Sequence, residues 1–281
     1  MSRALWAHLQ DALGLVPVHE QALGGGCVAD VVKLSGRGQD PVVLKKAKTP
    51  DDVDMLTREA KSLQLLAAHG LPVPDVVDVS EHGLVLSFVD GTPGPVNDVE
   101  VAEALAQLHQ HTRASFGLDF DAAIGGLPLD NTDQNDAWTF LVEQRIRPYA
   151  VMAVDKGHLP SSVLHDVDRL RAVLDDEAPP DAPRLMHGDV WGGNILARGG
   201  RLVGFVDPAP YFGDVEAELA FLQLFNTVGG AFFDAHHVMH PPRPGHQRRV
   251  RLHQLYPLGV HSVLFGGHYA QDFAQTLRSL V

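Results

Sequence analysis

Three oxygen-bearing side chains around a short apolar hairpin are the residues of this chain best suited to chemistry. In the stretch HGDVWGGNILARGGRLVGFVDPA (187–209), Asp189 precedes the hairpin, Asn194 stands at its start and Asp207 at its end. The Gly-Gly pair between ILAR and RLVGFVD is a strong signal for a two-residue hairpin turn. Because a hairpin brings its ends together, we expect Asn194 and Asp207 to face one point. Carboxylate and amide oxygens at that point would suit Mg²⁺.

The spacing of these residues matches a phosphoryl-transfer pattern, H-x-D-x-x-x-x-N followed later by a metal-binding Asp. In that pattern the first Asp accepts the proton of an attacking hydroxyl. Asp189 is therefore the candidate catalytic base, and Asn194 and Asp207 are the candidate Mg²⁺ ligands. Since short motifs recur by chance, turns and caps alone are the competing explanation for these polar residues.

Upstream segments add nucleotide-binding candidates in the order that a kinase requires. The stretch GGGCVADV, with Gly24, Gly25 and Gly26, lies between two expected strands and resembles a loop whose backbone approaches ATP phosphates. Lys45 ends the strand VVLK, where a cation can pair with the α- and β-phosphates. Glu59 lies in the following amphipathic helix and could hold Lys45 as an ion pair. Taken alone, Glu59 would be a solvated helix charge.

A further strand, LVLSFVDG, leads out of the expected sheet. The backbone of Ser87, Phe88 and Val89 could bond the edge of an adenine ring there. Lys46 follows Lys45 directly, and the alternation of a strand points it to the opposite face. These signals are weak one by one, but together and in this order they favour an ATP-dependent kinase.

The elements that would position these residues divide the chain near residue 90. After a helix at 2–13, residue patterns over 1–90 predict the order β-β-β-α-β-β, a small antiparallel sheet with one packed helix. The segment DGTPGPVND (90–98) is rich in residues that break regular structure. Helical patterns dominate 91–281. We therefore expect an α+β, two-lobed protein: a nucleotide-binding lobe (1–90) and a catalytic and substrate-binding lobe (91–281).

The charge and the cysteine content of the chain limit its expected binding partners and its cellular compartment. The chain has 35 Asp and Glu against 22 Lys and Arg, a net charge of −13. Such a surface repels phosphate backbones and anionic membranes, so neither nucleic acid nor a membrane is an expected partner. Cys27 is the single cysteine, which excludes an internal disulfide and is typical of a reducing compartment. With no signal-peptide pattern at the start, we expect a cytoplasmic protein.

Histidines are numerous, 16 in all, and several stand in the last quarter of the chain. Their spacing matches no metal-binding motif such as H-E-x-x-H. A metal site would need them to converge with carboxylates or thiolates. The sequence alone therefore predicts scattered surface and core histidines, which include His236, His237, His240, His246, His253, His261 and His268.

The sequence resembles the fructosamine (ketosamine) kinases over nearly its whole length. The resemblance rests on HGDVWGGN, VDPAPYFGD, EAELA, LAQLH (105–109), IGGLPLDN (124–131), WTFLVEQRIRP (138–148) and LFGGHY. The Trp of HGD-x-WGGN is its most specific part. It implies a bilobal protein-kinase-like fold, also found in aminoglycoside phosphotransferases. It further implies ATP- and Mg²⁺-dependent phosphorylation of the O3 hydroxyl of a ketosamine, a ribulosamine or fructosamine adduct of an amine or lysine, in deglycation.

By position, the resemblance assigns the base to Asp189, the metal ligands to Asn194 and Asp207, phosphate binding to Lys45 and its orientation to Glu59. Trp191 is a substrate-side candidate, because an indole face suits a sugar or an alkyl stem; packing beneath the loop is the alternative. Asp214 is a weaker substrate-side candidate, at a place where the family often has a His-Arg pair. Glu218 stands where the family often has Asp. Some members carry a redox-sensitive cysteine at the position of Cys27, so the chain is expected to be a monomer or a Cys27-linked dimer.

Two other readings stay open. A kinase for another hydroxylated amine, such as an aminoglycoside or an amino sugar, would use the same fold and metal residues. A pseudokinase that binds nucleotide without catalysis is the second alternative, although the chain keeps the base, the metal Asp and the strand Lys. A protein-serine kinase is disfavoured because no A-P-E segment follows Asp207.

Overall fold

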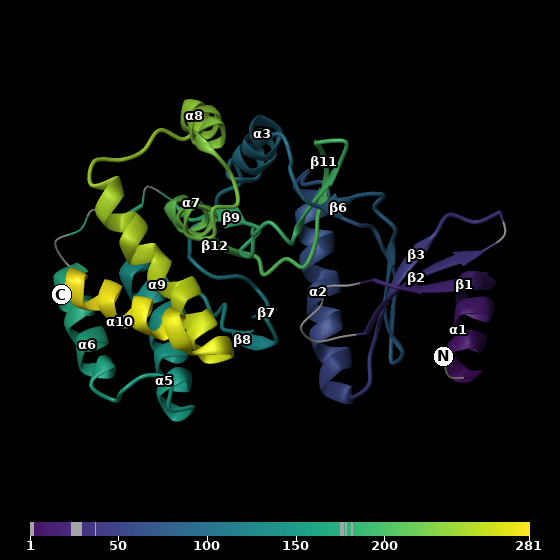
Figure 1. The fold of residues 1–281 in the computed structure, drawn as a ribbon, viewed down its shortest axis with the longest axis horizontal. Coiled ribbons are helices and arrows are strands. Elements are labelled where there is room, and N and C mark those ends of the chain that lie inside the picture. Colours follow the sequence, from purple (N-terminus) through teal and green to yellow (C-terminus); the bar gives the residue numbers. More distant parts are fainter. Residues whose placement is uncertain (1–2, 24–29, 37, 175–176, 178, 181) are drawn as a thin grey trace.

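A computed structural model of the chain describes residues 3–23, 30–36, 38–174, 177, 179–180 and 182–281 (Figure 1). Two sequence predictions fall outside these residues: the phosphate-binding role of Gly24, Gly25 and Gly26, and the redox role of Cys27. The described part combines an antiparallel sheet near the amino terminus with a larger, mainly helical region. This arrangement confirms the predicted α+β, kinase-like fold class.

The amino-terminal sheet has five antiparallel strands in the order β1-β2-β3-β5-β4. A helix packs on each face of this sheet, α2 on one and α1 on the other. The bounds are α1 (Arg3–Leu13), β1 (Pro17–Ala22), β2 (Asp30–Gly36), β3 (Val42–Lys46), α2 (Pro50–Ala68), β4 (Val76–Ser80) and β5 (Gly83–Ser87).

Alternation along the strands supplies both faces of the sheet. Leu44 of β3 and Val85 of β5 pack with Leu9 of α1, while Leu84 packs with Leu56 of α2. Because neighbouring side chains of a strand point to opposite faces, Lys45 lies on the α2 side. The packed helix expected for this sheet is α2, and the expected helix at 2–13 is α1.

Local sequence accounts for the start of α2. The Thr49 side chain accepts a hydrogen bond from the Asp52 amide, and the Asp52 carboxylate accepts one from the Thr49 amide. Pro50 occupies the first turn, where its missing N–H costs nothing. This capping box sets the beginning of the helix that carries Glu59.

The larger region is built from helices and three small sheets. Its helices are α3 (Asp98–Leu108), α4 (Ala137–Thr139), the π-helical segment η1 (Phe140–Ile146), α5 (Arg147–Asp155), α6 (Val163–Val173), α7 (Val215–Leu224), α8 (Gly230–Met239), α9 (His246–Phe265) and α10 (Gly267–Leu280). Its strand pairs are β7 (Ala122–Ile124) with β8 (Leu127–Leu129), β9 (Arg184–Met186) with β12 (Tyr211–Gly213), and β10 (Ile195–Arg198) with both β11 (Arg201–Phe205) and β6 (Thr92–Pro93).

The segment expected to break regular structure contains the two-residue strand β6. Thr92 and Pro93 pair with Ala197 and Leu196 of β10, so this connection is tied to the hairpin that carries the candidate site. Pro93 can join a sheet here because β6 is an edge strand, where a missing N–H is tolerated. Figure 1 shows β6 and β11 beside the upper end of α2, between the amino-terminal sheet and the other helices.

One apolar cluster holds the hairpin in place. Phe205 of β11 and Val190 of the preceding loop are fully buried together with Leu105 of α3, Leu222 of α7 and Phe232 of α8. Within the described residues, no helix combines the length and apolar character that a bilayer crossing requires.

Candidate active site

The predicted hairpin forms, and its ends meet. Gly199 and Gly200 have φ values of +60° and +79°, which two-residue hairpin turns require and which glycine adopts without steric cost. Ile195 pairs with Phe205. The Val206 amide then donates to the Asn194 carbonyl at 3.0 Å, which brings the residue before Asp207 against Asn194.

Asn194 is oriented by the candidate base. Its side-chain Nδ2 donates to the Asp189 carbonyl at 2.9 Å and to the Asp189 carboxylate Oδ2 at 3.1 Å. Because the amide nitrogen faces Asp189, the amide oxygen is the atom available to a cation. Asn194 is 4% exposed, so packing holds this orientation.

The surroundings of Asp189 disfavour its charged form. Burial, and then the nearby carboxylate of Asp207, raise the pKa of Asp189 to about 7, against the hydrogen bond from Asn194. A base whose pKa lies near the working pH is deprotonated often enough to accept a proton and basic enough to hold it. Asp189 therefore has the electrostatics of a general base.

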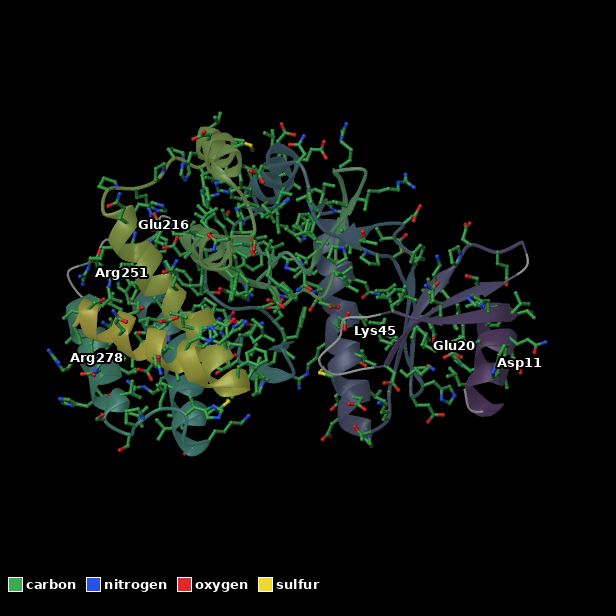
Figure 2. All side chains as sticks on the ribbon, viewed as in Figure 1. Asp11, Glu20, Lys45, Glu216, Arg251 and Arg278 are labelled. Atoms are coloured by element: carbon green, nitrogen blue, oxygen red, sulfur yellow. The ribbon has the colours of Figure 1, made fainter. Side chains whose placement is uncertain are left out.

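Lys45 connects the sheet to the hairpin. Its Nζ donates to Glu59 Oε1 at 2.5 Å and also to the Asp207 carboxylate. Figure 2 shows Lys45 between the sheet and α2. Burial works against its charge, but Glu59 and Asp207 raise the pKa of Lys45, so the ammonium stays charged. The next residue, Lys46, pairs with Glu20 at 2.5 Å on the other face of the sheet.

Asp207 adopts an uncommon backbone conformation. Its φ is +52°, in a region that costs a non-glycine residue about 1–3 kcal/mol and that recurs at functional sites. Its side chain is 39% exposed. One face of the carboxylate thus meets Lys45 while part of it stays open to solvent.

The loop that carries Asp189 is braced from α7, by a residue that sequence reasoning did not select. Glu218 Oε1 accepts from the Gly188 amide at 2.7 Å, and Oε2 accepts more weakly from the His187 amide at 3.4 Å. Although burial opposes it, the hydrogen bond from His109 lowers the pKa of Glu218, so the carboxylate stays ionised. The signal in the sequence was the EAELA motif, in which Glu218 stands where the family often has Asp.

The oxygen donors suit the metal that the sequence predicts. An amide oxygen at Asn194 and a carboxylate at Asp207 are hard ligands, and Mg²⁺ in proteins takes few protein oxygens, with phosphate and water completing its shell. The Lys45 ammonium supplies a positive charge beside them. Such an arrangement can bind a nucleoside triphosphate and neutralise the charge of its phosphates next to a proton acceptor.

Comparison with known proteins identifies the arrangement. A family model described as fructosamine kinase matches residues 1–281. The chain belongs to the fructosamine kinase family. It is 32% identical over 269 residues to a probable ketoamine kinase of Synechocystis sp., covering 92% of this chain and 88% of that protein.

Solved structures agree with this assignment. The crystal structure of a protein assigned as a fructosamine-3-kinase from Thermobifida fusca superposes with a TM-score of 0.88 at 30% identity, covering 100% of this chain and 99% of that one. The aminoglycoside phosphotransferase APH(4)-Ia, solved with ADP and hygromycin B, has a TM-score of 0.68 at 17% identity over 99% of this chain and 97% of that one, a likeness of fold alone. The protein is therefore a kinase.

Trp191 and Asp214, the two residues predicted on the substrate side of this fructosamine kinase family member, differ in how far they are exposed to solvent. Trp191 is 48% exposed, and its indole lies so close over Gly193 that an added Cβ there would stand 2.3 Å from the ring. Its ring is thus half-exposed over Gly193, rather than buried beneath the loop.

Asp214, in contrast, is 6% exposed and already engaged. Its carboxylate accepts from the Glu216 amide at 3.1 Å, capping α7, and contacts Arg243 at 2.7 Å and His253 at 3.3 Å. Against the effect of burial, the hydrogen bond with His253 and the charge of Arg243 lower the pKa of Asp214 to about 2. Within the part of the chain that the structure describes, no contact joins Asp214 to Asn194, Asp207 or the other side chains around Asp189.

The three residues predicted at the adenine edge stand where β5 ends. The Ser87 amide donates to the Asp75 carbonyl at 2.9 Å, and the Phe88 amide to the Pro41 carbonyl at 3.2 Å. The amide of Val89 has no hydrogen-bond partner among the residues described here. Of the three amides in this kinase, that of Val89 is therefore the one free to meet a nucleotide base.

Proposed function

We propose that this protein transfers the γ-phosphoryl group of ATP to the O3 hydroxyl of a ketosamine, a ribulosamine or fructosamine adduct of an amine or lysine. Membership of the fructosamine kinase family supports the substrate class, and kinase activity implies ATP as donor. Relatives named as probable ketoamine kinases point the same way. The observation that carries the proposal is the convergence of four side chains from two separate parts of the chain: Lys45 of β3, and Asp189, Asn194 and Asp207 of the stretch 187–209.

Each side chain has a task that follows from its surroundings. Asp189 orients the substrate hydroxyl and accepts its proton as the new O–P bond forms. Lys45, held by Glu59, directs its ammonium toward the phosphates. Asn194 and Asp207 would hold Mg²⁺, whose charge offsets that of the phosphates when it is bound. Most of the rate enhancement then comes from positioning and charge neutralisation.

Trp191 marks the substrate side of the site. An exposed indole beside the catalytic base offers an apolar face for a sugar ring or for the alkyl stem of an amine. Loss of the sugar portion from the phosphorylated ketosamine would release the free amine. The biological role that we propose is deglycation of amino acids or proteins.

The proposal is tested by a substrate panel. Purified protein is given Mg²⁺, ATP and one acceptor at a time: ribulose-lysine, fructose-lysine, an aminoglycoside or an amino sugar. We expect ADP formation and phosphate transfer with at least one ketosamine. The Asp189→Asn variant should lower kcat by about 10²–10⁴-fold, the range for a general base. Transfer to the aminoglycoside alone would reject the ketosamine assignment, and ATP binding without transfer to any acceptor would favour a pseudokinase.

A further inference from the structure

We propose a second metal site, for a divalent transition ion such as Zn²⁺, formed by three histidines at the ends of two helices. They are His109, which caps the carboxyl end of α3, His236 of α8, and His240, which caps the carboxyl end of α8. One ligand nitrogen from each of these histidines lies within 4.8 Å of the others. Figure 1 shows α3 and α8 side by side at the top of the molecule, with α7 below them. The site does not depend on the proposed kinase reaction.

The geometry of the three rings suits a metal. His109 Nδ1 lies 3.0 Å from His236 Nε2, and two ring nitrogens this close require a proton or a cation between them. Zn²⁺ binds imidazole nitrogens at about 2.0–2.1 Å, which places tetrahedral ligand atoms about 3.3 Å apart. The third nitrogen, from His240, lies within 4.8 Å of the other two.

Burial favours the ligand form of His236. Both His109 and His236 are fully buried, and burial lowers the pKa of His236, which keeps that ring in the neutral form that coordinates metals. His240 is only partly buried, and its Nε2 lies 3.1 Å from the Ala106 carbonyl oxygen, which a bound ion would replace as its partner, and 3.2 Å from the Gln110 side chain at the surface. The cluster therefore has an open side through which an ion and a fourth ligand, such as water, can enter.

A carboxylate supports the site from behind. The other nitrogen of His109, Nε2, lies 2.9 Å from Glu218 Oε2, and both side chains are at most 1% exposed. Metal-binding histidines usually donate their second N–H to a carboxylate, which orients the ring and makes it a stronger ligand. This contact orients the His109 ring through Nε2, so that the other ring nitrogen, Nδ1, faces His236.

A second cluster of potential metal ligands is already occupied by cationic side chains. Asp214, Glu216 and His253 also converge, but Arg249 forms a bidentate pair with Glu216 at 2.6 and 2.9 Å, and Arg243 pairs with Asp214 at 2.7 Å. Arginine charges already occupy those oxygens. Within the residues described, no arginine or lysine side chain hydrogen-bonds to a ring of the three-histidine cluster. No cationic side chain therefore occupies the ring nitrogens of this cluster.

The same Glu218 that supports His109 also accepts the Gly188 amide of the loop that carries Asp189. A bound ion would thus tie α3 to α8 and hold His109 against the brace of the catalytic loop. We infer that the ion is structural: it stabilises this corner of the molecule and leaves the Mg²⁺ ligands Asn194 and Asp207 untouched.

The test uses tag-free protein in saturating Mg²⁺, so that the Asn194 and Asp207 position is occupied. Zn²⁺ bound after equilibrium dialysis is counted by elemental analysis, and Tm is measured with and without Zn²⁺. Wild type should retain one Zn²⁺ per chain, with Tm raised by about 5 °C at a concentration near 100 times Kd. Substituted with Co²⁺, it should give the absorption bands of a four-coordinate ion.

Variants on α8 distinguish the cluster from adventitious binding. His240→Gln and His236→Phe should lose the bound ion, the Tm shift and the Co²⁺ bands. His240 is partly exposed, so its variant tests the site even where the buried His236→Phe fails to fold. The matched control is His237→Gln, the neighbouring histidine outside the cluster, which should behave as wild type. Retention of the ion by His240→Gln, equal loss in His237→Gln, or no Zn²⁺ bound by wild type would each overturn the proposal.

Discussion

Asp189 is placed where its charge is unfavourable for folding and useful for proton transfer. Burial and the Asp207 carboxylate raise its pKa to about 7. In an unfolded chain an aspartate titrates near 3.9. The folded protein therefore binds one more proton than the unfolded chain between these two pH values, and the stability gained from that proton is lost as the pH rises toward 7.

At the residue scale, we predict that Asp189→Asn increases stability at neutral pH while it removes activity. The asparagine is isosteric and uncharged, so it avoids the cost of a buried carboxylate. Without added metal, the Tm of the variant minus that of wild type should grow as the pH is raised from about 4 to above 7. Thermal denaturation in buffers with chelator checks this. A difference that stays constant over the range would contradict the raised pKa.

At the scale of elements, the loop before β10 is held between the segment that follows β11 and helix α7. Gly188 has a φ of +83°, and a Cβ added there would lie 1.9 Å from the Ala209 carbonyl oxygen. Its amide donates to Glu218. Only glycine fits between these two neighbours, so the position of Asp189 depends on backbone contact as much as on side chains.

We predict that Gly188→Ala displaces the catalytic loop. The added methyl group must push the backbone away from Ala209, and small misplacements of reacting groups can cost about 100-fold in rate. The matched control is Gly199→Ala in the hairpin turn, which has a similar φ of +60° but no atom within 4 Å of an added Cβ. That control should lose only about 1–2 kcal/mol of stability and keep its kcat. Equal kinetic defects in both variants would argue against the steric contact.

At the scale of the whole molecule, side chains connect the amino-terminal sheet with the catalytic hairpin. Lys45 is the clearest, because it bonds Glu59 of α2 and Asp207 beyond β11. In a protein of net charge −13, this cation stands among carboxylates and is well placed to attract an anionic nucleotide. Binding of a nucleotide between the two parts should therefore stabilise the whole molecule.

We predict that Mg²⁺ and ATP raise the Tm of wild type by about 5 °C at 100 times Kd. Lys45→Met should lose most of this shift, because it removes the charge that meets the phosphates. Lys46→Met is the matched control: it removes the neighbouring lysine, which pairs with Glu20 on the opposite face of the sheet. Differential scanning fluorimetry with and without nucleotide measures both. If the two variants kept equal shifts, Lys45 would have no special part in nucleotide binding.

What the sequence determined by itself was local. The Gly199-Gly200 turn specified the hairpin, so the meeting of Asn194 and the residue before Asp207 followed from chain geometry. The apolar spacing and the Thr49 cap specified α2. Lys45 of β3 lies on the face opposite to its neighbour Lys46 because strand side chains alternate. Each of these depends on residues close together in the chain.

What only the tertiary structure decided was non-local. The bond from Gly188 to Glu218, the three-histidine cluster, and the pairing of Asp214 with Arg243 join residues that are far apart in the sequence. No spacing rule finds them, because they depend on how α3, α7 and α8 pack. Hydrophobic burial drives this packing but is non-directional, so it does not specify which polar groups meet. Those contacts can be identified only after the positions of the helices are known.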